Sequence, residues 1–293
     1  MIAPSCNSAR YVGDIAHPFR SRERVVLIVR AYLDDTGTDT RSRITGVIGW
    51  AASTDAWISW ENEWLAFLAH PDIRLEKGWK QSDFASTFAG RRGEYLLWSE
   101  GQWLWARRRV WEILSQNSLF GVGCAVLKSD YEEIVALGKY HLPSNPYEFC
   151  LDRCLSKVLH SSVNLPHGEG IAIYCDQSKT QERIGNALAG WHEKYVTLYA
   201  DAGYRDVPTS TTYGSRIKLI PLQAADIIAT EAARACTAVL QGLTREEIDK
   251  AYPIVKELRD RDCIPDVVAY EKKEPIAEFE RGPSSPLKYG QKL

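Results

Sequence analysis

Short apolar runs typical of strands alternate with helix-like patterns along most of this 293-residue chain. The expected strands are rich in β-branched residues and are bounded by polar, glycine or proline positions. They are Val25–Asp34, Ile44–Ala52, Leu119–Leu127, Ile171–Cys175 and Ile217–Ile220. The first two flank the short polar stretch 36–43, so we expect them to pair antiparallel. The interleaving predicts an α/β fold with a mixed central sheet flanked by helices.

Between these runs, apolar residues recur at three- and four-residue spacing, which is the pattern of helices that pack on a core. Thr54 is expected to cap the first of them, and Thr244 with Glu247 has the spacing of a capping box. A long polar loop is expected at residues 199–215. The expected helices begin after Thr54 and cover 93–117, 129–137, 146–162, 180–195, 221–240 and 245–258.

Composition divides the chain into three regions. Residues 1–23 are polar and rich in arginine, so an irregular lead-in is expected there. Residues 24–242 carry the alternating pattern of one folded domain, which is helical without strands at about 54–117. Residues 243–293 are expected to form a C-terminal helix and, from Lys272, a loose tail that is charged and rich in proline and glycine.

The charge balance and the cysteines limit the partners and the compartment. A formal net charge of -2 gives no overall attraction to nucleic acid or anionic lipid, so a nucleic-acid contact needs a local basic patch. The seven cysteines include no CxxC pair, which favours a reducing, cytoplasmic compartment, and Cys150 and Cys154 are expected to be core residues. No stretch approaches the roughly 18 apolar residues of a membrane-spanning helix, so no membrane partner is expected.

Three aspartates occupy comparable places in the expected fold. Asp34 ends the first strand, Asp176 directly follows the fourth, and Asp226 lies in the first turns of the last core helix. Strand ends and helix starts converge on one rim of an α/β sheet, where ligand chemistry concentrates. Three carboxylates there would repel one another unless a divalent cation lay between them, and oxygen ligands suit Mg²⁺ or Mn²⁺. Gln223 shares a helix face with Asp226 and is a supporting residue, as is Asp35.

Each aspartate also has a simpler interpretation. Asp34 can belong to a strand-ending turn in which Gly37 takes a positive φ. Asp176 can form an Asx-turn or a helix cap, and Asp226 can stabilise a helix start. Only their joint occurrence favours a functional site.

Several segments resemble a known family. AYLDDTGT at 31–38, KGWKQSDF at 77–84, IAIYCDQS at 171–178 and LQAADIIATEAAR at 222–234 are similar to motifs of the domain-of-unknown-function family 3800 (DUF3800), over roughly residues 28–235. The chain departs from the family where Asp35 and Thr36 replace the usual Glu and Ser, and at Trp79–Lys80, where a usual histidine is absent. The resemblance implies an RNase H-like fold, in which the Trp-rich helical stretch at about 54–117 is an insertion.

The resemblance also implies a set of acids. RNase H-like enzymes place one acid in the first strand, one on the helix before the fourth strand, one after that strand and one on the last helix. Asp34, Asp176 and Asp226 match three of these places. The remaining place falls on the 146–162 helix, where either Glu148 or Asp152 can complete the set and both can equally face solvent. With two metals about 4 Å apart, such a site activates water on one ion and stabilises the leaving oxygen on the other.

Nine of the ten tryptophans lie between Trp50 and Trp111, interleaved with arginines. Aromatic and guanidinium groups together can stack and bind single-stranded nucleic acid. Tryptophan at helical spacing is more often core, and it can also form the interface with a protein partner. We favour the core interpretation.

The leading hypothesis is a metal-dependent phosphodiesterase, in particular a nuclease, that binds Mg²⁺ or Mn²⁺ through Asp34, Asp176 and Asp226. One alternative is a catalytically inert RNase H-like binding or regulatory module, which the near-neutral charge and Asp35 favour. A further alternative is a hydrolase of a small phosphorylated metabolite. No histidine has the spacing of a metalloprotease or of a catalytic triad, which argues against a serine hydrolase.

Overall fold

The computed structural model describes residues 29–37, 41–73, 75, 78–84, 87–117, 119–137, 142–162, 171–176 and 209–252. The expected lead-in at 1–23, the expected helix at 180–195 and the expected tail from Lys272 lie outside these residues, as does the end of the 245–258 helix after residue 252.

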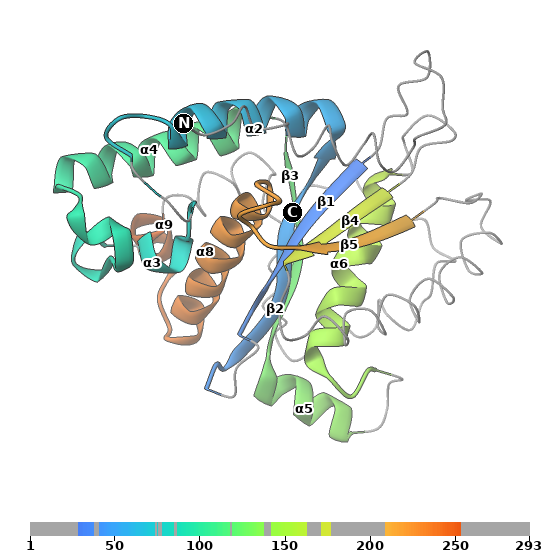
Figure 1. Cartoon of the computed structure of the whole chain (residues 1–293). Helices are drawn as coiled ribbons and strands as arrows, with labels where there is room; N and C mark the ends of the chain where they lie inside the picture. The colour runs from blue at the N-terminus through green and yellow to red at the C-terminus, as the bar shows by residue number, and fades with distance from the viewer. Residues whose placement is uncertain are drawn as a thin grey trace, which may run out of the picture.

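Five strands form one mixed sheet (Figure 1). They are β1 (Val29–Thr36), β2 (Ile44–Ser53), β3 (Phe120–Leu127), β4 (Ile171–Asp176) and β5 (Thr209–Gly214), in the order β3-β2-β1-β4-β5. β2 pairs antiparallel with both β1 and β3, as expected for the first hairpin. β1, β4 and β5 run parallel. The centre of the sheet is therefore β1, between its hairpin partner and a parallel neighbour.

Helices cover both faces of this sheet (Figure 1). α8 (Leu222–Leu240) lies across β1 and β2 on one face, where α2 (Thr54–Leu68) also packs. α6 (Pro146–Ser162) and α5 (Lys128–Ala136) lie on the other face, against β3 and β2. The other helices among the described residues are α3 (Gln81–Phe84), η1 (Phe88–Gly90), η2 (Gly93–Leu97), α4 (Glu100–Gln116) and α9 (Arg245–Ala251). The predicted α/β fold, with a mixed sheet flanked by helices, is confirmed.

The alternation of side chains along each strand separates the core into two clusters. On β1, Tyr32 belongs to the cluster under α8 and α2, whereas Val29, Ala31 and Leu33 belong to the cluster under α6. β4 alternates in the same way, with Tyr174 on the α8 side and Cys175 on the α6 side. Every strand position can therefore be assigned to one face of the sheet.

Two predictions around β5 are wrong. The predicted long loop at 199–215 ends in a strand, because Thr209–Gly214 pairs with β4. The predicted strand Ile217–Ile220 is instead a turn, in which the Leu219 amide donates to the Ser215 carbonyl and the Ile217 side chain is 61% exposed. β5 is an edge strand of threonine, serine and tyrosine, so it lacks the apolar alternation that identified the other strands.

Two helix predictions also need correction. The single helix predicted at 93–117 is divided into η2 and α4, because Ser99 caps α4 and forms a capping box with Gln102. Ser53, and not Thr54, caps α2 by accepting a hydrogen bond from the Ala56 amide. The capping box of Thr244 and Glu247 at α9 is confirmed.

The tryptophans from Trp50 to Trp111 lie mainly inside the protein. An aromatic cluster runs from β2 through α2 and the 78–84 segment to α4, and seven tryptophan side chains are at most 5% exposed: Trp50, Trp57, Trp60, Trp64, Trp79, Trp98 and Trp103. The predicted core role is confirmed for these seven. Cys150 and Cys154 are buried in the α6 cluster, also as predicted. Within the described residues, no helix has the length and apolar character needed to cross a membrane.

Candidate active site

The register of β1 and β4 brings two of the predicted acids together. It pairs Leu33 with Cys175, and the next residue on each strand is an aspartate, Asp34 on β1 and Asp176 on β4. Because parallel strands run in the same direction, the two aspartates lie side by side near the carboxyl ends of β1 and β4. β1 continues beyond Asp34 to Thr36, paired with β2, before Gly37 turns the chain with a φ of +67°.

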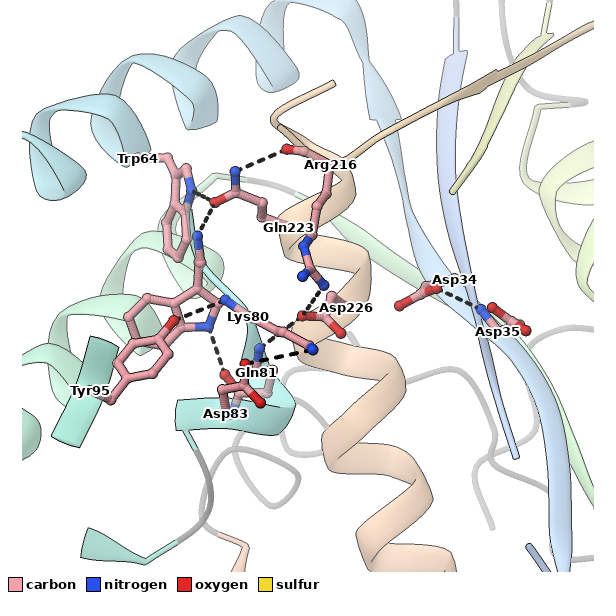
Figure 2. Close-up of polar contacts among 11 residues, drawn as sticks. Asp34, Asp35, Trp64, Lys80, Gln81, Asp83, Tyr95, Arg216, Gln223 and Asp226 are labelled. Atoms are coloured by element: carbon pink, nitrogen blue, oxygen red, sulfur yellow. Dashed lines mark hydrogen bonds and ion pairs between the residues drawn. The ribbon is translucent and has the colours of Figure 1, made fainter. Parts of the chain in front are cut away.

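Both acids lie on the face of the sheet that α8 covers. Tyr32 and Tyr174, two residues earlier on each strand, stack at 4.6 Å between ring centroids within the α8 cluster. Side chains two apart in a strand share a face. Asp34 and Asp176, two residues after these tyrosines, therefore also face α8, and Figure 2 shows the Asp34 carboxylate on the α8 side of β1.

The third predicted acid comes from α8 itself. Asp226 lies in the second turn of α8, whose neighbouring residues Ala224, Ala225 and Ile227 are fully buried against the sheet. The Trp50 indole donates to the Ala224 carbonyl over 3.1 Å and so fastens this part of α8 to β2. Asp34, Asp176 and Asp226 thus share one face and one edge of the sheet, which we call the carboxylate edge.

Electrostatic coupling joins the three acids. Burial raises the pKa of Asp34 well above its ordinary value, although part of its surface reaches solvent, and the charge of Asp226 is the next cause, ahead of Asp35 and Asp176. Opposing this rise, the Asp35 amide donates to Asp34 Oδ1 over 2.9 Å. The pKa of Asp226 is likewise raised, first by burial and also by Asp176. Carboxylates arranged in this way favour a bound proton or cation.

Asp226 also has positive neighbours. Arg216 Nη1 lies 3.8 Å from Asp226 Oδ2, and the charges of Arg216 and Lys80 both act to lower the pKa of Asp226. Figure 2 shows the two cations approaching Asp226 from different segments, Arg216 from the turn before α8 and Lys80 from the segment beside α3. The carboxylate edge is therefore bordered by two basic side chains.

Residues 78–84 hold the Asp226 carboxylate in place. The Gln81 amide donates to Asp226 Oδ2 over 2.8 Å. The Gln81 side chain donates to Glu231 Oε1 over 2.7 Å and accepts from the Trp79 indole over 2.8 Å. This buried network fixes the 78–84 segment along α8 and holds the Asp226 carboxylate through its Oδ2 atom.

Gln223, the predicted supporting residue, is a structural link. Its Oε1 accepts hydrogen bonds from the Trp64 indole and the Trp79 amide, each over 2.9 Å, and its Nε2 donates to the Arg216 carbonyl over 3.0 Å. Gly78 has a φ of +69°, and a Cβ there would lie 2.7 Å from Gln223 Nε2. Gln223 therefore positions the segments that carry Lys80 and Arg216.

The other predicted site residues are not on the face of the sheet that carries the three acids. Asp35, one position after Asp34, projects toward the opposite face of the sheet, as Figure 2 shows. Glu148 and Asp152 are half-buried on α6, which covers that opposite face. Their charges act on Tyr131 of α5. The structure therefore brings together Asp34, Asp176 and Asp226, but not Asp35, Glu148 or Asp152.

No group of three or more His, Cys, Asp or Glu side chains within the described ranges is arranged to hold a metal ion. Three residues of the site were missed in the sequence: Gln81, Lys80 and Arg216. Lys80 and Gln81 are held by hydrogen bonds to Tyr95 and Asp226, which lie further along the chain, whereas Arg216 contacts Gln223 and Asp226 across the turn before α8. No apolar periodicity marks such contacts. For Lys80 and Gln81, the similarity of residues 77–84 to a family motif was the only available signal.

Comparison of the chain with models of known protein families gives no match, and no curated protein matches it either.

Proposed function

We propose that this protein is a metal-dependent phosphodiesterase, most specifically a nuclease, with Asp34, Asp176 and Asp226 as its metal ligands. The supporting observation is that β1 and β4 deliver Asp34 and Asp176 as neighbours to the face of the sheet on which α8 presents Asp226. First strand, fourth strand and late helix are the places that the resemblance to DUF3800 assigns to acids of an RNase H-like site. We extend the proposal to that fold, to a helical insertion at about 54–117, and to a cytoplasmic location.

The donor chemistry of the carboxylate edge fits Mg²⁺ or Mn²⁺. All three side chains offer hard oxygen ligands. The pKa of Asp34 and that of Asp226 are raised by burial and by other carboxylates, and a divalent cation would reverse this effect by favouring the charged forms. The proposal is supported by the position of the three acids at one edge of the sheet and by the electrostatic coupling between them. The described side chains do not by themselves form a metal-ligand group.

The protein's own residues would orient the reaction. When bound, a divalent ion supplies an activated water and charge stabilisation for phosphodiester hydrolysis. The Gln81 amide holds Asp226 Oδ2 and so limits the rotation of this carboxylate. The Asp35 amide holds Asp34 Oδ1 in the same manner. These hydrogen bonds reduce the freedom of two ligand side chains before a substrate binds.

The direct test is cleavage of single- and double-stranded DNA and RNA with Mg²⁺ or Mn²⁺. We expect metal-dependent cleavage that Asp34→Asn, Asp176→Asn or Asp226→Asn each reduces at least about 100-fold, the scale of a lost catalytic metal interaction. Asp72→Asn is the matched control, because its side chain is 63% exposed. Circular dichroism would verify that each variant remains folded.

The same assays separate the alternatives. Hydrolysis of small phosphate esters without cleavage of any nucleic acid would favour a metabolite hydrolase. Aspartate-independent binding of nucleic acid or protein, with no hydrolysis of any substrate, would favour an inert module. Cleavage that persists in all three Asn variants would contradict the proposed ligand set.

A further inference from the structure

Two cations border Asp226 on side chains that remain partly exposed. The Arg216 side chain is 28% exposed and the Lys80 side chain 42%, whereas the Asp226 side chain is only 13% exposed. Among the described residues, Arg216 forms an ion pair with Asp226 at 3.8 Å and Lys80 forms one with Asp83 at 3.6 Å, while the Lys80 charge also acts on Asp226. Both basic side chains are therefore more accessible to solvent than the Asp226 carboxylate that they border.

The backbones that carry these cations are fixed by buried groups. The Arg216 carbonyl accepts from Gln223, whose side chain is buried and also bound to Trp64 and Trp79. The Lys80 amide donates to the Tyr95 hydroxyl over 2.9 Å. In Figure 2 these anchors bring both segments to the same end of α8. The backbone at Arg216 and at Lys80 is therefore held by hydrogen bonds to buried side chains.

A phosphodiester substrate needs such groups at this site. A nucleic-acid backbone carries one negative charge per phosphate, and the carboxylate edge and the net charge of -2 would both repel it. A guanidinium can face a carboxylate on one side and hold a phosphate through a planar pair of donors on another. Arg216 has this geometry available, because its contact with Asp226 uses Nη1.

We propose that Arg216 and Lys80 form the phosphate-binding side of the carboxylate edge and hold a backbone phosphate of nucleic acid next to Asp226. This inference rests on the proposed nuclease function and adds the binding residues of the substrate. It makes the Arg216–Asp226 contact a resting pair, which a substrate phosphate shares or replaces.

The test measures the binding of a fluorescent single-stranded DNA by fluorescence anisotropy in the presence of EDTA. The DNA has about 12 nucleotides, a length within the site sizes of proteins that bind single strands. Without metal, binding is measured apart from cleavage. We expect Arg216→Gln to weaken binding about tenfold and to reduce the slope of log affinity against log salt by about one, the effect of one lost phosphate contact. Lys80→Gln should lower the same slope by a similar amount.

Lys218→Gln is the matched control. Lys218 lies in the same turn as Arg216, is exposed, and undergoes the same loss of charge. Its effect should stay below about twofold and leave the salt slope unchanged. Arg216→Lys should retain the slope, because the charge remains, while losing affinity with the planar donor pair.

Asp226→Asn distinguishes a phosphate-binding role from a structural one. Removing the carboxylate frees Arg216, so binding in EDTA should become tighter. Part of that gain comes from removing the repulsion between the Asp226 charge and the DNA, so the double variant Asp226→Asn with Arg216→Gln should keep that part and lose the rest. A salt slope for Arg216→Gln equal to that of the wild type, or an Asp226→Asn gain that is undiminished when Arg216 is also replaced, would overturn the inference.

Competitors and cleavage assays separate the possible failures. Displacement of the DNA by inorganic phosphate, at concentrations that match the oligonucleotide phosphates, would assign the pair to phosphate monoesters and overturn the nucleic-acid assignment.

Cleavage by the wild type that Arg216→Gln and Lys80→Gln leave unchanged would reject this inference and keep the nuclease. Arginine-dependent binding without cleavage under any metal would keep this inference and reject the nuclease. A wild type that neither binds nor cleaves would reject both.

Discussion

The Gln81 amide donates a 2.8 Å hydrogen bond to Oδ2 of Asp226, although Gln81 lies 145 residues earlier in the chain. Nearby, the Trp79 amide donates to Gln223 on the same helix. Two backbone amides, those of Trp79 and Gln81, thus attach the 78–84 segment to α8, and the Gln81 side chain adds a third hydrogen bond, to Glu231. The orientation of one proposed metal ligand depends on this attachment.

Replacing Gly78 should loosen the attachment. In Gly78→Ala, the φ of +69° becomes strained and the new Cβ meets Gln223 Nε2, so we expect a loss of about 2–3 kcal/mol in the free energy of unfolding. Gly242→Ala is the matched control, because Gly242 has a φ of +82° with nothing within 4 Å of the new Cβ. Its loss should be about 1–2 kcal/mol, from backbone strain alone. Equal losses in urea denaturation would contradict the contact with Gln223.

Gln223→Leu should be strongly destabilising. It removes the acceptor of two buried donors, the Trp64 indole and the Trp79 amide, and each unsatisfied donor costs about 1–3 kcal/mol. Chemical denaturation should therefore show a loss of about 2–5 kcal/mol. The control Gln241→Leu is on an exposed residue after α8 and should stay within about 0.5 kcal/mol of the wild type. A small effect of Gln223→Leu would show that water replaces the lost acceptor.

Asp34→Asn should stabilise the metal-free protein at neutral pH. The folded-state pKa of Asp34 lies well above its ordinary value of 3.8, so the folded protein holds a proton that the unfolded chain has already released. Stability from this group is therefore present at low pH and is lost as pH rises above 3.8 toward the raised folded-state pKa. The advantage of Asp34→Asn should appear over this interval and vanish in acid. Denaturation at a series of pH values in EDTA measures it, and a variant less stable than the wild type at neutral pH would contradict the raised pKa.

Divalent metal should stabilise the wild type and not Asp34→Asn. A ligand at about one hundred times its Kd adds about 2.7 kcal/mol to the free energy of unfolding. Thermal melts with increasing Mn²⁺ or Mg²⁺ should show this gain, EDTA should reverse it, and Asp72→Asn should keep it. An equal gain in Asp34→Asn would place the metal elsewhere.

The described cysteines should resist alkylation in the folded protein. Cys124, Cys150, Cys154, Cys175 and Cys236 are free and buried, and burial is the largest cause that raises the thiol pKa of Cys154 and Cys175, the latter to about 12. Inaccessibility slows the reaction at all five cysteines, and a low thiolate fraction slows it further at Cys154 and Cys175. The pKa of Cys124 is lowered by its hydrogen bond with Cys150, so its protection depends on burial. Mass spectrometry after treatment with N-ethylmaleimide should find these five unmodified until denaturant is added. Modification of Cys150 or Cys154 under native conditions would contradict their core role.

The elements predicted from the sequence are those with a strong local signal. β1, β4 and α8 were recognised because apolar side chains recur at the period of a strand or a helix. β5 was missed because the threonines of this edge strand resemble a loop, and Ile217–Ile220 was misread because its apolar residues lie in a turn. The periodicity of apolar residues detects an element with one buried apolar face. It fails for a strand without such a face and for a turn that contains apolar residues.

The same limit applies to the candidate site. Asp34, Asp176 and Asp226 could be identified because each follows or begins a recognisable element. Lys80 and Gln81 could not, because they act on α8 from a segment remote in the chain. Arg216 could not, because it reaches Asp226 from a turn whose neighbouring residues, Ile217–Ile220, were predicted as a strand. The reverse error affected Asp35: alternation along β1 turns it to the opposite face from Asp34, a fact that adjacency in sequence conceals.

Gln223 also gives the protein an optical reporter. Its single side-chain oxygen is shared by the Trp64 indole and the amide of Trp79, and the two indole rings lie 5.7 Å apart at their centroids. Indole emission responds to the polarity and hydrogen bonding around the ring, so a ligand that shifts α8 against the 78–84 segment would change the emission. Occupancy of the neighbouring acids could then be followed by fluorescence without any attached dye.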